Sequence, residues 1–334
     1  MTVLEVIQKS ADFLAKKGVE SPRLQAELLL AHLLKLPRMK LYLNFERTLA
    51  PAEVDALREL VRRRGRREPL QHITGSTSFC GLEISVNRHA LVPRPETELL
   101  AEMGWRFLTQ LSESRVPRDP DLKNEDGDSY NSSLRALDFG TGTGCIAIAL
   151  AVKCPAAKIT ATDISADALT LASENAARHH VAEQIEFVQS DGFAVLMSEG
   201  RVAQVPNSSA ETEIRDSCNS SLRRMGFDLI ISNPPYIPSA EIATLQPEVR
   251  DFDPRGALDG GADGLDFYHL IASQAAAFLK PGGKVMLEFG DGQAEALRRM
   301  FANEKWVVEA VEEDYSHRAR ILIAKSSSSS SSPS

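Results

Sequence analysis

Apolar positions near the start of the chain recur at the three- and four-residue spacing of amphipathic helices. Val3 and Ile7 belong to the first such group, and two further groups follow. Pro22 and Pro51 stand where new helices are expected to begin, because proline is well tolerated in a first helical turn. The pattern therefore predicts a small helical domain over residues 1–73.

The spacing of apolar residues changes after residue 73. Residues 74–92 contain short alternating runs such as LEISV, which predict a β-hairpin linker. Further on, helical stretches separate the apolar runs RALDF, AKITATD, QIEFVQS, FDLIIS and GKVMLEF, an alternation that predicts βαβ units and a mostly parallel sheet. The last two runs, WVVEAVEE and ARILIAK, are too close together for a helix between them and predict an antiparallel hairpin at one edge. We expect one α/β domain over residues 93–325.

Three polar segments interrupt this alternation. Residues 112–133 and 198–225 are rich in Ser, Asn, Asp and Glu and are interpreted as loop insertions, and residues 326–334 form a Ser-rich tail that we expect to be disordered. Both insertions lead into the amino ends of predicted strands, whereas open α/β sheets bind ligands at the carboxyl ends. We therefore expect both insertions to lie away from the chemistry.

Composition narrows the class of protein. The 334 residues are 43% apolar and 25% charged, which is typical of a globular chain. A net charge of −8 argues against general electrostatic binding of nucleic acid or of an anionic membrane. No apolar stretch is long enough to cross a bilayer, so a cytoplasmic location is expected. The cysteines and histidines show no metal-ligand spacing, and no metal is expected.

The first candidate for chemistry is the glycine loop DFGTGTGC, which joins a strand to a helix. Gly140, Gly142 and Gly144, with Thr141 and Thr143 between them, would let the backbone approach a ligand and direct helix-start amides at it. The loop is neither a dinucleotide fingerprint nor a phosphate-binding Walker loop, because it lacks their final residues. A tight strand-to-helix turn without a ligand is the alternative.

Acidic residues follow the next two strands. Asp163 would lie at the carboxyl edge of the sheet, where its carboxylate would accept both hydroxyls of an adenosine ribose. It could instead cap the next helix, although Ser165 is available for that. Asp191, followed by Gly192, lies at the equivalent edge and would meet an adenine amino group or simply form a turn.

The most specific motif is Asn233-Pro234-Pro235-Tyr236, which follows the apolar run FDLII and so emerges at the same edge. Two prolines stiffen the backbone and remove two amide donors, which leaves a rim of hydrogen-bond acceptors. A Pro-rich turn at the end of a strand is the alternative, but such a turn needs neither the Asn nor the Tyr. The motif favours recognition of a flat NH₂ group.

Together these motifs resemble S-adenosylmethionine-dependent methyltransferases of the seven-stranded, Rossmann-like class I fold. The whole chain is similar to the release-factor glutamine methyltransferases, the PrmC or HemK family. The similarity extends to the helical N-terminal module, to PLQHITG, FCGLEISV and LVPRPETELL in the linker region, and to the late loop DFDPRGALDGGADGLDFY.

The resemblance implies S-adenosylmethionine as the methyl donor. It also implies that the acceptor is the glutamine of the Gly-Gly-Gln motif in class I peptide chain release factors, methylated on N5. The acidic net charge leads us to expect no direct binding of nucleic acid or membrane. The implied cofactor residues are Gly140, Thr141, Gly142, Thr143, Gly144, Asp163, Asp191, Gly192 and Asn233. The implied substrate residues are Asn233, Pro234, Pro235 and Tyr236, of which Asn233, Pro234 and Tyr236 are catalytic.

One departure concerns adenine. Family members often carry an aromatic residue directly after the third-strand aspartate, where this chain has Gly192 and then Phe193. The sequence leaves open whether Gly192 or Phe193 contacts adenine.

Weaker candidates keep two interpretations each. The arginine run at residues 62–67 is either a solvated helix end or a docking surface for an acidic partner. Residues 1–85 hold 14 Lys and Arg against 10 Asp and Glu, so the positive charge is concentrated there. Arg94, Glu96 and Glu98 either order the entrance to the site or cap the helix that they begin.

Three functions remain open at this stage. Besides release-factor methylation, the chain could methylate another planar nitrogen, either a ribosomal-protein glutamine or an exocyclic amino group of nucleic acid. A non-enzymatic cofactor-binding scaffold is the third possibility, although the intact glycine loop and NPPY motif argue against it.

Glu288, which ends the GKVMLEF strand, would face the cofactor or cap a turn.

Overall fold

The computed structural model describes residues 1–115, 134–197 and 226–327, and the chain forms two compact units. The first unit comprises Met1–Thr77, Val86–Arg88 and Ala243–Asp253. The second comprises Ser78–Ser85, His89–Ile242 and Pro254–Ser334. The two predicted insertions, apart from residues 112–115, and the tail from residue 328 lie outside the described residues. No pattern in the sequence indicated that residues 243–253 belong with the helical unit.

The first unit is helical, as its spacing of apolar residues predicts. Thr2 and Glu5 form a capping box at its start. Leu24, an apolar residue soon after Pro22, is 41% exposed and lies outside the core. The other apolar faces pack into one core around Leu14 and Leu29. The helices are α1 (Val3–Lys16), α2 (Pro22–Leu34), α3 (Arg38–Tyr42), α4 (Pro51–Gly65), α5 (Leu70–Thr74) and α11 (Pro247–Arg250).

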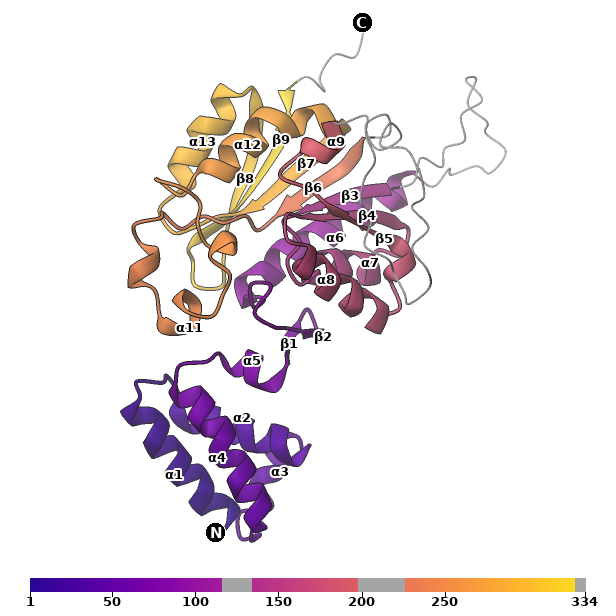
Figure 1. Ribbon diagram of the computed structural model, residues 1–334. Coiled ribbons are helices and arrows are strands. Elements are labelled where there is room, and N and C mark those ends of the chain that lie inside the picture. The colour runs from indigo at the N-terminus through magenta and orange to yellow at the C-terminus, as the bar shows by residue number, and fades with distance from the viewer. Residues whose placement is uncertain (116–133, 198–225, 328–334) are drawn as a thin grey trace, which may run out of the picture. The chain divides into compact units, whose positions relative to one another are not determined.

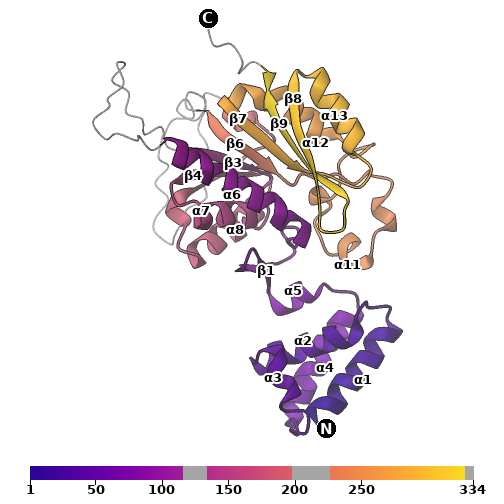
Figure 2. The same ribbon diagram turned by 180° about the vertical axis from the view of Figure 1, so that it is seen from behind.

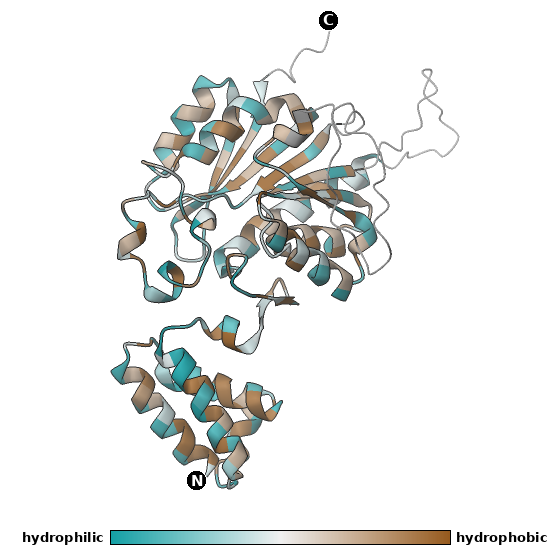
Figure 3. Ribbon diagram, viewed as in Figure 1, coloured by the Kyte–Doolittle hydropathy of each residue, from teal (hydrophilic) through white to brown (hydrophobic). Residues whose placement is uncertain are grey.

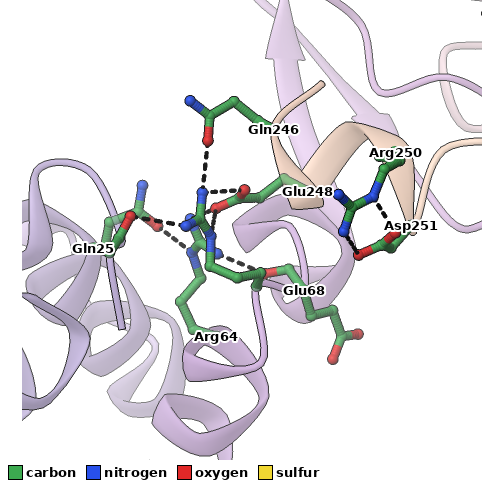
Figure 4. A network of polar contacts seen from close by, with 9 residues as sticks. Gln25, Arg64, Glu68, Gln246, Glu248, Arg250 and Asp251 are labelled. Atoms are coloured by element: carbon green, nitrogen blue, oxygen red, sulfur yellow. Dashed lines mark hydrogen bonds and ion pairs between the residues drawn. The ribbon is translucent and has the colours of Figure 1, made fainter. Parts of the chain in front are cut away.

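Two arginines form a network of hydrogen bonds and ion pairs with residues 243–253, which belong to this unit (Figure 4). Arg64 Nη2 lies 2.7 Å from Glu248 Oε1, and Arg67 forms a bidentate pair with the same carboxylate at 2.7 and 2.6 Å. Arg64 also donates to Gln25 at 2.9 Å, and its side chain is only 5% exposed. Neither interpretation of the arginine run holds for these two residues, because Arg64 and Arg67 are ion-paired inside the unit.

A two-stranded sheet, β1 (Ser76–Phe79) and β2 (Leu82–Ser85), confirms the predicted hairpin. The main sheet of the second unit has the order β5-β4-β3-β6-β7-β9-β8 (Figure 1). Its first five strands are parallel, and β9 runs antiparallel to both β7 and β8. The strands are β3 (Leu134–Phe139), β4 (Ala157–Asp163), β5 (Ile185–Gln189), β6 (Phe227–Ser232), β7 (Leu279–Glu288), β8 (Trp306–Glu313) and β9 (Ala319–Ser326). The predicted sheet and its edge hairpin are confirmed, but Ser326 belongs to β9 rather than to the tail.

Helices cover both faces of this sheet (Figures 1 and 2). One apolar cluster packs α6 (Pro95–Arg115), α7 (Cys145–Lys153) and α8 (Ala166–Arg178) against the strands. The other involves α9 (Ala194–Met197), α12 (Asp266–Gln274) and α13 (Ala294–Asn303). The strands between them are largely hydrophobic (Figure 3).

Helix α6 corrects one predicted boundary. It continues to Arg115, so the insertion expected to begin at residue 112 begins with four helical residues. Short 3₁₀ turns complete the described elements at η1 (Ala182–Gln184), η2 (Ile242–Thr244), η3 (Arg255–Ala257) and η4 (Ala275–Phe278). None of the helices in the described ranges has the length and apolar character needed to cross a membrane.

Candidate active site

A cavity of about 250 Å³ opens at the carboxyl edge of β3, β4 and β6 in the second unit. Parallel strands bring the loops that follow them to one edge, so motifs far apart in the sequence meet there. Of the residues predicted from the sequence, the cavity is lined by Gly140, Thr141, Gly142, Thr143, Asp163, Asp191, Gly192, Asn233 and Pro235. Gly144, Pro234 and Tyr236 lie outside this lining.

The glycines of the loop are required for different reasons. Gly140 has a φ of 73°, and a Cβ added there would meet no atom within 4 Å. Its backbone therefore borders open space in which a ligand would fit. Gly144, with a φ of 80°, precedes α7, and a Cβ there would lie 2.9 Å from that of Ala172. Gly144 allows α7 and α8 to pack closely.

A buried carboxylate that the sequence analysis missed braces the loop. Asp138 Oδ2 accepts hydrogen bonds from the Thr141 hydroxyl at 2.6 Å and from the Ala147 N–H at 3.1 Å. Burial raises the pKa of Asp138 to about 7, although both hydrogen bonds lower it. A charged residue inside the apolar run RALDF was the available signal. Asp138 ties the start of the loop to the first turn of α7.

Asp163 joins the glycine loop to the next strand end. Its Oδ2 accepts the Gly142 N–H and its Oδ1 accepts the Ser165 N–H, each at 2.9 Å. Ser165 itself caps α8 by accepting the Ala168 N–H, so Asp163 is not the helix cap. Burial raises the pKa of Asp163, and the backbone hydrogen bonds partly offset that rise. Each carboxylate oxygen retains capacity for a further donor, such as a ribose hydroxyl.

Gly192, in the loop after β5, has a left-handed φ of 60°, which disfavours a side chain at this position. A Cβ on Gly192 would lie 2.9 Å from Leu270 Cδ2. Phe193 is 1% exposed and stacks between Phe139 and Phe278, with ring centroids 4.9 and 5.2 Å away. Phe193 is therefore a core residue, and neither position supplies a stacking partner for adenine.

Apolar residues from two other segments line the cavity, and the sequence analysis missed them. Ile164, which directly follows Asp163, is 65% exposed and lines the cavity. Phe267, from the first turn of α12, lines it as well. An apolar residue next to a strand-end carboxylate was a usable signal for Ile164. Phe267 lies in the late loop, whose position relative to the strands follows only from the fold.

Asn233 and Tyr236 of the NPPY motif lie in different surroundings. Asn233 lines the cavity, and its Nδ2 donates to Thr97 Oγ1 at 3.0 Å. Within the described residues, Asn233 Oδ1 accepts no hydrogen bond. The Tyr236 carbonyl accepts a hydrogen bond from Gln293 Nε2 at 3.0 Å, and burial raises the pKa of the Tyr236 hydroxyl to about 12. Tyr236 is thus a neutral and largely apolar neighbour of the site.

The weaker candidates lie near this edge. Arg94 lines the cavity, whereas Glu96 and Glu98 stand in the first turn of α6. Glu288 is buried at the end of β7. No group of three or more His, Cys, Asp or Glu that could hold a metal occurs in the described part of the chain.

Comparison with known proteins shows to which family the chain belongs. Residues 5–75 match the PrmC N-terminal domain, and residues 128–203 match the methyltransferase small domain. A release factor glutamine methyltransferase of Geobacter sulfurreducens is 41% identical, over 90% of this chain and 88% of its own length. The chain belongs to the release factor glutamine methyltransferase family. A family member from Chlorobaculum tepidum is 40% identical, with 88% and 87% of the two chains covered.

Membership in this family makes the protein a methyltransferase and confirms the predicted enzyme class. A cofactor-binding scaffold without activity does not fit this membership. The N-terminal match falls on the helical unit, and the methyltransferase match begins before β3 and includes both the glycine loop and Asp163.

Proposed function

We propose that this protein transfers a methyl group from S-adenosylmethionine to N5 of the glutamine in the Gly-Gly-Gln motif of class I peptide chain release factors. The relatives named above carry release factors in their names. The observation that carries the proposal is an Asn233 side chain that lines the cavity with its Oδ1 unoccupied by the described residues. Translation factors as substrates would place the reaction in the cytoplasm.

The residues present fit the methyl donor. Open space at Gly140 and the adjoining Thr141 to Thr143 backbone suit its methionine part, and the Asp163 carboxylate suits its ribose. Asp191 and the apolar Ile164 suit its adenine. When bound, S-adenosylmethionine supplies an electrophilic methyl group on a sulfonium centre.

The acceptor side follows from amide chemistry. A carboxamide nitrogen is a weak nucleophile because its lone pair is delocalised into the carbonyl group, so it needs accurate placement more than it needs a base. We assign Asn233 Oδ1 and the Pro234 carbonyl as the acceptors for its two N–H bonds. These acceptors would hold the nitrogen in line and stabilise the positive charge that develops on it. Tyr236 would provide an apolar wall beside the amide plane.

The same acceptors would determine specificity. A glutamate side chain at neutral pH has no hydrogen to donate, so its oxygens would face two further oxygens. Mismatches of this kind discriminate by roughly 10⁴. Glutamine should therefore be strongly preferred over glutamate.

The test is incubation with labelled S-adenosylmethionine and a panel of acceptors: a class I release factor, its Gln→Ala variant at the Gly-Gly-Gln motif, a ribosomal protein and DNA. We expect label on the release factor alone and none on its variant. Label confined to DNA or to the ribosomal protein would contradict the proposal. The Asn233→Ala enzyme serves as the control for contaminating activity.

A further inference from the structure

A buried carboxylate lies next to the NPPY motif. Ser232 on β6 pairs with Leu287 on β7, so the following residues, Asn233 and Glu288, emerge side by side at the same sheet edge. Thr97, from the first turn of α6, accepts a hydrogen bond from Asn233 Nδ2 at 3.0 Å, and its hydroxyl is near enough to the Glu288 carboxyl to lower its pKa by hydrogen bonding. Thr97 is 3% exposed and Glu288 is 2% exposed. The three side chains form a group that is largely shielded from water.

The direction of these hydrogen bonds follows from the number of hydrogens. An ionised Glu288 carboxylate only accepts, so the single Thr97 hydroxyl hydrogen is donated to it. The Thr97 oxygen is then an acceptor, and Asn233 must present its NH₂ end to it, as it does at 3.0 Å. The Oδ1 end of Asn233 is therefore the end left for a ligand.

Ionisation of Glu288 is finely balanced. Burial raises its pKa to about 7, the Thr97 hydrogen bond lowers it, and its Oε2 has no partner among the described residues. The other titratable and charged groups that act on it are Glu96, Arg94, Arg320, Tyr236 and Tyr268. Glu96 raises the pKa of Glu288, whereas Arg320 and Arg94 lower it.

We propose that Thr97 and Glu288 are positioning residues that hold the Asn233 amide with its oxygen toward the acceptor nitrogen of the substrate. This inference rests on the proposed function, in which Asn233 Oδ1 accepts a substrate N–H. Without the Thr97 hydroxyl, the Asn233 amide is free to rotate by half a turn and offer its NH₂ group instead. Two NH₂ groups would then face each other, and the substrate would lose its alignment.

Protonation of Glu288 has the same effect. A protonated carboxyl can donate to Thr97 through its O–H, in which case the Thr97 hydrogen turns to Asn233 and is accepted by Oδ1. An ionised Glu288 can only accept, so ionisation favours the aligned arrangement, whereas a protonated Glu288 also permits the reversed one. The rate of methyl transfer should therefore fall as the pH drops through about 7.

The first experiment compares Thr97→Val with Thr97→Ser. We expect Thr97→Val to lower kcat by about tenfold or more with the Kd for S-adenosylmethionine unchanged, and Thr97→Ser to restore most of it. A release factor carrying Glu in place of the target Gln should inhibit Thr97→Val more strongly than wild type, because a rotated Asn233 donates to a carboxylate. Three results would overturn the inference. They are a Thr97→Ser enzyme that does not recover kcat, a Thr97→Val enzyme with a kcat within threefold of wild type, and equal inhibition of Thr97→Val and wild type by the Glu-containing release factor.

The second experiment remains decisive even if Thr97→Val does not fold. Glu288→Gln keeps an acceptor for the Thr97 hydroxyl but does not titrate, so kcat should lose its fall between pH 8 and pH 6. Persistence of that fall would assign it to another group, such as Asp138, and would refute the role of Glu288. These readouts require a wild-type enzyme that methylates release factor. If the wild type does not, the proposed function fails first, and the two failures are thereby distinguished.

Discussion

The Asp163 carboxylate accepts the backbone N–H of Gly142 at 2.9 Å, which joins the end of β4 to the glycine loop after β3. Its other oxygen accepts the Ser165 N–H. Both bonds come from the backbone and fix the carboxylate in place before any ligand arrives. A preorganised acceptor of this kind lowers the cost of ordering groups on binding.

Replacing Asp163 should therefore weaken cofactor binding more than it weakens the fold. We expect Asp163→Ala to raise the Kd for S-adenosylmethionine by roughly 100-fold, because a hydrogen bond to a charged group contributes about 1.5–3 kcal/mol. Asp163→Asn retains one acceptor oxygen and should lie between Asp163→Ala and wild type. Isothermal titration calorimetry measures all three, and a Kd of Asp163→Ala within threefold of wild type would argue against a ribose contact.

Gly140 offers a second test of where the cofactor lies. Gly140 and Gly75 both have left-handed backbones, with φ of 73° and 81°, and a Cβ added at either would meet no atom within 4 Å. Alanine at either position should cost about 1 kcal/mol of stability, because the conformation disfavours a side chain. Only at Gly140 would the added methyl group enter the cavity, so only Gly140→Ala should weaken S-adenosylmethionine binding, by about tenfold or more. Urea unfolding and calorimetry on both variants measure the two effects, and equal affinities would place the cofactor elsewhere.

The sheet and the convergence of motifs were predictable because they follow from short-range patterns. Apolar runs of five to seven residues separated by helical stretches permit few arrangements, and parallel strands bring their carboxyl ends to one edge. For that reason Gly140, Asp163 and Asn233 could be expected to meet although they are distant in the sequence. The cavity lining confirms this expectation.

Contacts between distant side chains were not predictable. Nothing in the sequence around Thr97 shows that it faces Asn233 and Glu288, because that depends on how α6 lies against β6 and β7. The ion pair of Arg64 with Glu248 joins residues 184 positions apart, and it turns a residue expected at a solvated helix end into a buried one. Periodicity predicts which face of an element is buried, but it carries no information about the partner of a charge.

Asn233→Ala should separate chemistry from cofactor binding. Loss of one preorganised acceptor should lower the rate of methyl transfer by roughly 10²–10³, about 2–4 kcal/mol of transition-state stabilisation, while the Kd for S-adenosylmethionine stays nearly unchanged. Asn303→Ala is the matched control, since Asn303 is exposed on α13 and does not line the cavity. Single-turnover assays with release factor give the rates, and an Asn233→Ala enzyme with more than half the wild-type rate would contradict the role assigned to Asn233.

The pair of Arg64 with Glu248 should matter for stability. Glu248→Ala leaves the buried Arg64 guanidinium without its carboxylate, and we expect a loss of about 2 kcal/mol in the free energy of unfolding. Asp55→Ala is the control, because Asp55 is 68% exposed in its pair with Arg58 and should contribute little. Urea unfolding of both variants at pH 7 provides the comparison, and equal losses would show that burial of the Arg64 pair adds nothing.

The same pair predicts how the loss depends on pH. Burial acts to raise the pKa of Glu248, but hydrogen bonds from Arg67 and Arg64 outweigh it and hold that pKa below its usual value of 4.5. A carboxylate with a lowered folded pKa contributes stability that is complete above the unfolded pKa and is lost as the pH falls through the folded value. The difference in unfolding free energy between wild type and Glu248→Ala should therefore be constant from pH 8 to pH 5 and shrink below pH 4. A difference that stays the same at pH 3 would mean that Glu248 acts through packing rather than through its charge.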